Sequence, residues 1–253
     1  MKVSVCIPVY NGEHLLARAV DSALNQGEDL EVILVDDAST DGTAEICRKY
    51  AETDSRIVYL RNDHSRGASG SRNRAVEQAR GQYVAFLDAD DMWAPGKLKK
   101  QLALLENTGS VLCCSARELM KDDGTLTGRV IHVPNKITYR KLLRGNTINC
   151  SSVVVRRNVA LEFPMEHEDS HEDYITWLKI LKKYGPAVGI DEPLLKYRLS
   201  AQGKSGSKLK SAGMTFKVYR YMGFGLLIST VCFVCYAVNG VVKYAGAFRH
   251  RQK

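Results

Sequence analysis

The sequence predicts an α/β protein with a mostly parallel central sheet that carries helices on both faces. Strand and helix patterns alternate through the first half of the chain, and the strand segments are nearly continuous apolar runs, as in strands covered on both sides. The chain has 253 residues, of which 45% are hydrophobic and 25% charged. This globular balance allows a sizeable core without disulfides or a structural metal.

The first half of the chain supplies most of the expected sheet. Residues 15–24 carry apolar side chains on one side at helical spacing. Strands are expected at residues 3–9, 30–35, 57–60, 83–87 and 111–114. Helices are expected near residues 15–24, 44–50, 69–79 and 95–106. Such alternation is typical of parallel strands joined by helical crossovers.

The second half is less regular. Asp122-Asp123-Gly124 indicates a turn. Beyond it we expect a strand at residues 151–155, an amphipathic helix at 172–183, a strand-rich return at 188–198 and a Gly/Ser/Lys linker at 201–211. The chain therefore divides into three parts, residues 1–105, 106–200 and 201–253.

The net charge of +8 is concentrated in the last part of the chain. Residues 193–253 hold 11 Lys and Arg and no Asp or Glu, which leaves 25 basic and 28 acidic residues in the other 192. A nearly neutral body with a basic, partly apolar tail suits an anionic lipid surface better than a duplex groove. No nucleic-acid partner is expected.

The seven cysteines are odd in number and have mostly apolar neighbours, so we expect buried, reduced thiols. Cys232-x-x-Cys235 has no second ligand pair nearby, and a zinc or redox centre there is not favoured. Because the first strand is expected to begin within the first three residues, no signal peptide is expected. The protein is therefore expected to face the cytosol.

Ligands of a parallel α/β sheet bind beyond the carboxyl ends of its strands. Four expected loops emerge there, at residues 8–12, 36–42, 64–73 and 88–91. They bring carboxylates, arginines and glycine-rich backbone to one edge of the sheet.

Asp88-Ala89-Asp90 is the most specific of these features. Two carboxylates directly after an apolar strand offer hard oxygen ligands to Mg²⁺ or Mn²⁺, usually completed by substrate phosphates. The alternative is that these aspartates, like Asp36-Asp37, form turns or cap a helix. Arg72 by itself fits an ordinary charge on a helix face.

Four segments together resemble the signature blocks of family 2 glycosyltransferases. They are residues 5–11, 35–43, 72–73 and 86–91, in the right order and spacing. The resemblance implies the GT-A nucleotide-diphospho-sugar transferase fold and inverting, metal-dependent transfer from a UDP-sugar. Residues 1–105 would bind the donor, and residues 106–200 would bind the acceptor and carry the base.

The resemblance also implies roles on the donor side. Pro8 and Tyr10 would lie against the nucleotide, and Asp37 would accept a hydrogen bond from the base, typically uracil. Arg72 would border the nucleotide pocket.

The two aspartates after the fourth strand would serve the metal. Asp88 would lie near the ribose and the metal, and Asp90 would bind Mn²⁺ or Mg²⁺ directly. A divalent cation stabilises the charge that develops on a departing diphosphate without proton transfer.

Inversion requires a carboxylate on the acceptor side to take the hydroxyl proton. Residues 166–173 offer many candidates, and the family pattern of an acidic pair before an aromatic-containing helix points to Asp173 as the base. Glu172 and Trp177 would lie on the acceptor side. The alternative is a near capping box of Ser170 with Asp173.

Lys204 and Lys208 lie in the expected linker. By analogy they would fold over the donor diphosphate and exclude water. A solvated basic linker is the alternative.

The tail has no charge between Arg220 and Lys243. The run is long enough by count for a membrane span, which needs ~20 apolar residues. It contains Asn239 and four glycines between positions 223 and 246, and basic residues flank both ends. We expect one or two membrane-associating helices in the cytoplasmic leaflet, with a true span or a soluble docking helix as alternatives.

The end of the chain resembles bacterial enzymes that build O-antigen, lipooligosaccharide or capsule, whose acceptors are often sugars on undecaprenyl diphosphate. We therefore expect transfer of a hexose, with glucose or galactose favoured, from a UDP-sugar to a lipid-linked saccharide. The expected location is the cytoplasmic face of the bacterial inner membrane. The alternatives are a nucleotidyltransferase, which would want a Gly-rich loop with Arg and Lys in place of Tyr10-Asn11-Gly12-Glu13, and a non-enzymatic membrane adaptor with a Rossmann-like body.

Overall fold

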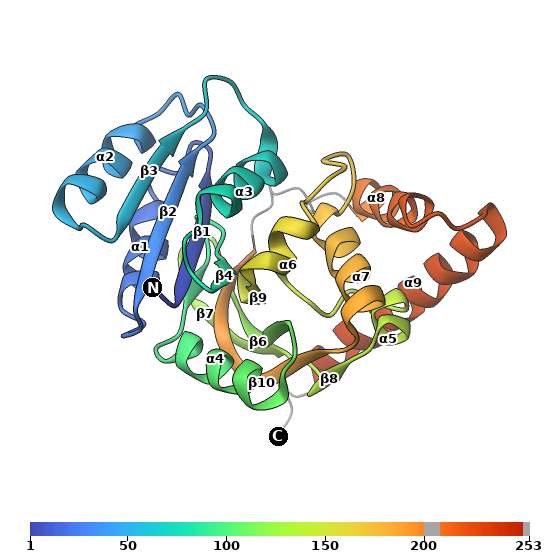
Figure 1. Cartoon of the computed structure of the whole chain (residues 1–253). Helices are drawn as coiled ribbons and strands as arrows, with labels where there is room; N and C mark the ends of the chain where they lie inside the picture. Colours follow the sequence, from blue (N-terminus) through green and yellow to red (C-terminus); the bar gives the residue numbers. More distant parts are fainter. Residues whose placement is uncertain (200–207, 250–253) are drawn as a thin grey trace.

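The computed structural model describes residues 1–199 and 208–249. Within them the chain forms one ten-stranded sheet in the order β3-β2-β1-β4-β9-β6-β10-β5, with β7 beside β6 and β8 beside β10 (Figure 1). The strands are β1 (Val3–Val9), β2 (Leu30–Asp36), β3 (Ile57–Arg61), β4 (Tyr83–Phe86), β5 (Met92–Trp93), β6 (Leu112–Met120), β7 (Leu126–Ile131), β8 (Lys136–Ile137), β9 (Val154–Arg156) and β10 (Ala187–Arg198).

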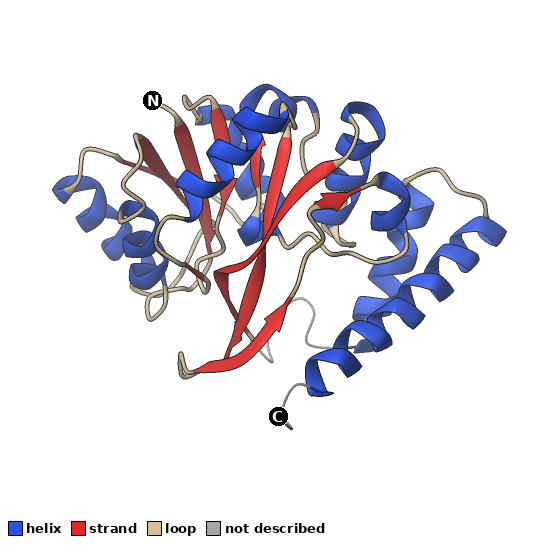
Figure 2. Ribbon diagram, turned by 90° about the horizontal axis from the view of Figure 1, so that it is seen from below, coloured by secondary structure: helices blue, strands red, loops and turns tan. Residues whose placement is uncertain are grey.

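Helices cover both faces of the sheet, as the sequence predicts (Figure 2). One face packs against α1 (Leu16–Leu24), α2 (Thr43–Thr53) and α4 (Lys97–Thr108). The other packs against α3 (Gly67–Gln78), α6 (Arg157–Glu162) and α7 (Glu172–Tyr184). In α1 the buried side chains are Leu16, Ala19, Val20 and Ala23, the stripe expected of an amphipathic helix.

The expectation of a mostly parallel sheet is wrong, because the sheet is mixed. Strands β3, β2, β1 and β4 are parallel neighbours. Strand β9 then runs antiparallel to both β4 and β6, and β5, β7 and β8 also pair antiparallel. Strands β6 and β10 are again a parallel pair, so the second half of the sheet mixes both directions. The connection between β9 and β10 contains α6 and α7, whereas β6 and β7 are joined by a tight turn.

The second half also differs in detail from the sequence expectations. Strand β6 runs on to Met120 and forms a hairpin with β7 across the predicted turn at Asp122-Asp123-Gly124. The strand expected at residues 151–155 is a 3₁₀ turn, η1 (Cys150–Ser152), followed by β9. The cysteines are unpaired, and five of the seven are buried.

The tail forms two helices, α8 (Lys208–Tyr221) and α9 (Leu226–Arg249). The linker expected at residues 201–211 is therefore wrong from Lys208 onward, and its earlier part lies outside the described residues. Helix α8 belongs to the body: Val218 and Tyr219 are buried, and the Tyr219 hydroxyl donates to the carbonyl oxygen of Leu143, in α5 (Tyr139–Leu143), at 2.8 Å. No helix of the described chain is long and apolar enough to cross a membrane.

Candidate active site

The loops after β1 and β2 hold each other at the carboxyl edge of the sheet. The backbone N–H of Asn11 donates to Ser39 Oγ at 3.0 Å, and that of Gly12 donates to Thr43 Oγ1 at 2.8 Å. Asn11 itself adopts a left-handed backbone with φ of 49°. Tyr10 projects from this paired loop with its side chain 58% exposed, and Pro8 is half-buried just before it. Both side chains therefore lie at the edge where a nucleotide is expected.

Asp37 is buried at the end of β2 and organises the loop that follows β3. Its carboxylate accepts five hydrogen bonds, all from residues 62–71. Burial alone would raise the pKa of Asp37, but bonds from the Arg66 amide and from Ser65 lower it below its usual value. The donors are the side chains of Asn62, Ser65 and Ser71 and the backbone N–H groups of Arg66 and Gly67. The hydrogen bond expected between Asp37 and the base of the nucleotide remains a prediction.

Arg72 joins the two sides of the site. Its guanidinium is buried in α3, where Nη2 lies 2.5 Å from Asp88 Oδ1 and Nη1 lies 3.1 Å from Glu172 Oε1. Asp88 follows β4, and Glu172 is the first residue of α7, 100 positions after Arg72 in the chain. The Arg72 side chain thus links Asp88, which is expected on the sugar-donor side, to the helix that carries the expected catalytic base, Asp173.

The residues after β4 concentrate negative charge. Burial, followed by the charge of Asp88, raises the pKa of Asp90 to about 6. Burial and both neighbouring aspartates raise the pKa of Asp91 well above its usual value. Arg198 braces this loop: its backbone N–H donates to Asp91 Oδ1 at 2.8 Å, and its Nε donates to the Asp90 carbonyl at 3.0 Å. The Asp88 amide donates to Ser151 Oγ at 3.1 Å.

This acidic loop fits a divalent cation chemically. Three carboxylates share four residues, and Asp91 Oδ2 is buried without a hydrogen-bond partner in the part of the chain that the structure describes. Among those residues, no group of three or more His, Cys, Asp or Glu is arranged to hold a metal by itself. Asp90 and Asp88 would therefore share the ion with substrate phosphates, as is common for Mg²⁺ sites.

Asp173 lies in the first turn of α7, half-buried beside Glu172. Burial and the Glu172 charge raise the pKa of Asp173 to about 6, against the opposing charges of His171 and Arg72. The capping-box alternative is wrong: the N-cap is His171, and Ser170 Oγ donates instead to the His167 carbonyl at 2.9 Å. Because Glu172 is committed to Arg72, Asp173 is the better placed of the pair to accept a proton.

The loop before α7, residues 164–171, is held from two sides. On the α3 side, Asn73 pairs twice with the Met165 backbone, at 2.7 and 2.8 Å, and Glu168 accepts from Ser69. A Cβ on Gly67, which has φ of +71°, would come within 2.7 Å of the Glu168 carboxyl carbon. We call residues 164–171 the base loop.

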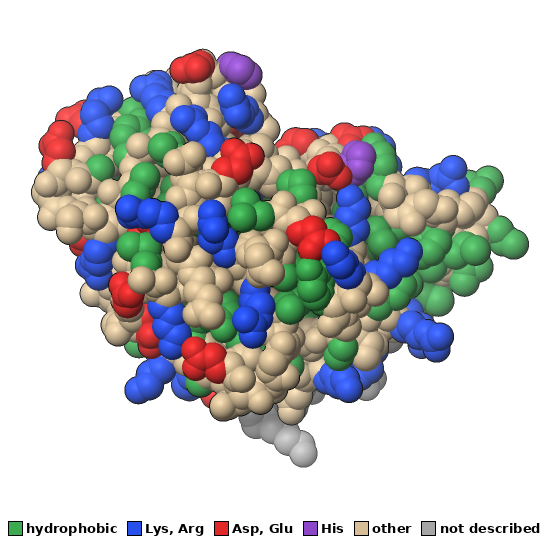
Figure 3. Space-filling model, viewed as in Figure 1, with side chains coloured by type: hydrophobic (Ala, Val, Ile, Leu, Met, Phe, Trp, Pro, Cys, Tyr) green, Lys and Arg blue, Asp and Glu red, His purple; other side chains and the backbone are tan. Residues whose placement is uncertain are grey.

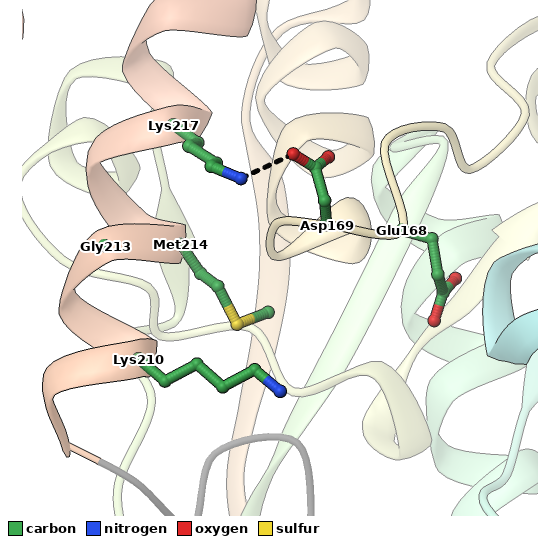
Figure 4. A pocket seen from close by; sticks show the side chains of 6 residues that line it. All are labelled: Glu168, Asp169, Lys210, Gly213, Met214 and Lys217. Carbon is green, nitrogen blue, oxygen red and sulfur yellow. Dashed lines mark hydrogen bonds and ion pairs between the residues drawn. The ribbon is translucent and has the colours of Figure 1, made fainter.

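On the α8 side, Lys217 Nζ donates to Asp169 Oδ2 at 2.6 Å, and both residues line a cavity of about 440 Å³ (Figure 4). Tyr221 also donates to Asp169, and its ring stacks on His167 at 3.7 Å. Among the residues lining the cavity are Lys210 and Met214. Asp88, Asp90 and Asp173 are not among the residues that line it, so this cavity is not the acidic site.

The remaining expected site residues lie elsewhere. Trp177 is 1% exposed in the core, with its ring 5.9 Å from that of Phe86. It packs α7 onto the sheet and offers no surface to an acceptor. Lys204 lies outside the described residues, and Lys208 begins α8 with its side chain outside them.

Comparison with known proteins identifies the family. The model of glycosyl transferase family 2 matches residues 4–163, a span that includes the β1, β2 and β4 loops and Arg72. This chain belongs to glycosyltransferase family 2. It is 39% identical over 243 residues, covering 95% of this chain and 96% of the relative, to a putative teichuronic acid biosynthesis glycosyltransferase, TuaG, of Bacillus subtilis (strain 168).

A second relative extends over nearly the whole glycosyltransferase chain. It is the UDP-Glc:alpha-D-GlcNAc-diphosphoundecaprenol beta-1,3-glucosyltransferase WfaP of Escherichia coli, which is 34% identical over 99% of this chain and 98% of its own. Among solved structures, S. aureus TarS 1–349 in complex with UDP-GlcNAc matches 87% of this chain and 66% of its own, with a TM-score of 0.67 and 21% identity.

A second solved structure matches 98% of this chain and 74% of its own chain, with a TM-score of 0.71 and 19% identity. It is the mannosyltransferase PcManGT of Pyrobaculum calidifontis in complex with GDP-Man and Mn²⁺. At these identities the two structural matches establish the GT-A-like fold.

Proposed function

We propose that this glycosyltransferase moves a hexose from a UDP-sugar to a lipid-linked saccharide during bacterial surface polysaccharide synthesis. The observation that carries the proposal is the Arg72 bridge, which sets the acidic loop of β4 beside the α7 turn that bears Asp173. The relatives named for teichuronic acid synthesis and for glucosyl transfer to a diphosphoundecaprenol acceptor support the acceptor class. Glucose is the favoured sugar and galactose the second.

The reaction we propose is a single displacement with inversion. Asp173 takes the proton of the acceptor hydroxyl as its oxygen attacks the anomeric carbon, and the bond to UDP breaks. Asp88 and Asp90 would hold Mn²⁺ or Mg²⁺, and such an ion would supply positive charge to stabilise the departing diphosphate. Tyr10 and Pro8 lie against the nucleotide, and Arg72 holds Asp88 and Glu172 at a fixed separation.

A donor screen tests this proposal. The purified full-length chain would be given UDP-glucose, UDP-galactose, UDP-GlcNAc, GDP-mannose or a dTDP-sugar, with Mn²⁺ and a GlcNAc-diphosphate-lipid acceptor, and released nucleotide would be measured. We expect UDP release from a UDP-hexose that depends on both acceptor and metal. Release of GDP or dTDP alone, or of pyrophosphate from an NTP, would contradict it, the latter in favour of a nucleotidyltransferase.

We also propose that the enzyme works at the cytoplasmic face of the inner membrane. The sequence of the tail supports this placement, since residues 193–253 contain no acidic residue and 11 basic ones. A lipid-linked acceptor would be met at that surface.

A further inference from the structure

One face of α9 carries a row of large apolar side chains that nothing in the described chain covers. Leu227 is 79% exposed, and Val231, Val234 and Val238 are each more than half exposed. They follow one another at intervals of four, three and four residues, so they share one face of the helix. We call these four residues the α9 stripe; the green side chains over the α8–α9 pair in Figure 3 belong to this region.

The rest of α9 is anchored to the protein. Phe233 packs edge-on against Phe216 of α8, with ring centroids 6.1 Å apart. The ring centroid of Tyr236 lies 6.1 Å from that of Tyr174 in α7, and Asn239 Nδ2 donates to the Arg144 carbonyl at 2.8 Å. Since these contacts fix the helix on its inner side, the stripe is held outward as a stable feature of the surface.

The part of the chain that carries the stripe has charges of one sign. No acidic residue occurs between Pro193 and Lys253, and Arg220 lies exposed on α8 just before the turn into α9. Two copies of the stripe packed together would bring two basic tails face to face without acidic partners inside them. An anionic lipid surface offers both an apolar layer and the opposite charge.

We propose that the α9 stripe rests in the headgroup region of an anionic phospholipid bilayer, with the helix parallel to the surface. An interfacial helix of this kind buries its apolar face about 5–10 Å into the boundary between headgroups and acyl chains. The basic residues of the tail then contact the headgroups. The stripe thereby adds a lipid-binding surface to the enzyme body.

This surface connects to the base loop through α8. Helix α8 packs on α9 with Phe216 and holds Asp169 with Lys217 and Tyr221. Asp169 lies four residues before Asp173. If the proposed function is right, a lipid-linked acceptor would approach the base from the side on which the protein meets the lipid.

Vesicle flotation of the full-length chain tests the stripe. We would compare the native chain with the triple variant Leu227→Gln, Val231→Gln and Val234→Gln, because Gln keeps helix propensity. The matched control is Leu126→Gln with Leu161→Gln, two side chains that are 45% and 41% exposed outside the tail. Vesicles of phosphatidylcholine alone would be compared with vesicles that contain about 30% phosphatidylglycerol.

We expect the native and control chains to float with anionic vesicles and the triple variant to bind at least about tenfold less. Equal flotation of the triple variant and the native chain would overturn the proposal. So would a native chain that ignores vesicles and forms a dimer that the triple variant dissociates. Equal binding to neutral and anionic vesicles would overturn the anionic-lipid assignment.

Activity separates this inference from the proposed function. The triple variant should release UDP with a water-soluble acceptor at the native rate, which reports intact folding, and lose at least about tenfold with a lipid-linked acceptor in anionic vesicles. Loss of both activities equally would contradict a role confined to lipid contact. If the native chain transfers sugar to neither acceptor, the proposed function is contradicted. The flotation experiment still tests lipid binding by the α9 stripe in that case.

Discussion

At the scale of single residues, Arg72 and Asp173 have roles that depend on burial. A guanidinium between two carboxylates out of water is held tightly, because losing it leaves charges without compensation. Asp173 differs, since its neighbour Glu172 is occupied by Arg72 and its own pKa is raised to about 6. A carboxylate with a pKa in this range can take a proton efficiently near neutral pH.

The raised pKa of Asp173 predicts the pH dependence of transfer. The base must be ionised, and a pKa of about 6 means that it is protonated below that value and ionised above it. The rate at saturating donor and metal should therefore rise through pH 6 and level off near neutrality. Transfer rates and UDP affinity would be measured between pH 5 and 8, and a flat rate profile would contradict the assignment.

Replacing Arg72 tests the bridge. Arg72→Met should lower the free energy of unfolding by about 3–5 kcal/mol, because the buried Glu172 carboxylate loses its partner. Adding Glu172→Gln should restore part of that loss. Urea unfolding of the native chain, the two single variants and the double variant would measure the interaction free energy between Arg72 and Glu172. An Arg72→Met chain as stable as the native one would mean that the bridge is not formed in solution.

At the scale of elements, the base loop is the segment that connects the parts of the site. Helix α3 holds it through Asn73 and Ser69, and α8 holds it through Lys217 and Tyr221. A segment fixed from both sides keeps Asp173 at a constant distance from the acidic loop. Its rigidity should therefore affect the chemical step more than donor binding.

The variant Asn73→Ala removes both hydrogen bonds to the Met165 backbone. We expect faster amide exchange in residues 164–171, a stability loss of about 1–3 kcal/mol and a lower kcat with an unchanged KM for the donor. Asn25→Ala, at the exposed end of α1, is the matched control. If Asn73→Ala raised the donor KM while sparing kcat, the base loop would act on the nucleotide instead.

Sequence patterns predicted the elements whose signals are local. The apolar strands β1 and β2 and the stripe of α1 are of this kind, and so is the start of α7 at Glu172. Strand β9 has three residues and runs antiparallel between two strands far apart in sequence, so no local pattern predicts its direction.

In the site, too, only residues with a local sequence signal could be predicted. The aspartates after β2 and β4 could be found by their position after apolar strands. The five donors to Asp37 come from residues 62–71, and Glu172 lies 100 positions from Arg72, so their pairing depends on tertiary packing. Asn73 stood in the family block at residues 72–73, but nothing in the sequence pointed to its pairing with Met165. Arg198, which is buried, carried no sequence signal at all.

At the scale of the whole molecule, the sheet places charged side chains from segments far apart in the sequence at one edge. Strand β4 carries the acidic loop, β10 ends in Arg198 beneath that loop, and α7 sets Asp173 beside Arg72. The same chain then presents a basic, apolar tail next to the base loop. The loop that we propose to serve the donor and the helix turn that we propose to face the acceptor are therefore joined through Arg72.

The most direct test of this account compares Asp90→Asn with Asp173→Asn. Calorimetry would measure UDP binding with and without Mn²⁺, and UDP release would measure transfer, on the same preparations. We predict that Asp90→Asn loses metal-dependent UDP binding and transfer together. Asp173→Asn should bind UDP as the native enzyme does and transfer about 10²–10⁴-fold more slowly. Near-native turnover by Asp173→Asn, or native Mn²⁺-dependent UDP binding by Asp90→Asn, would contradict the account.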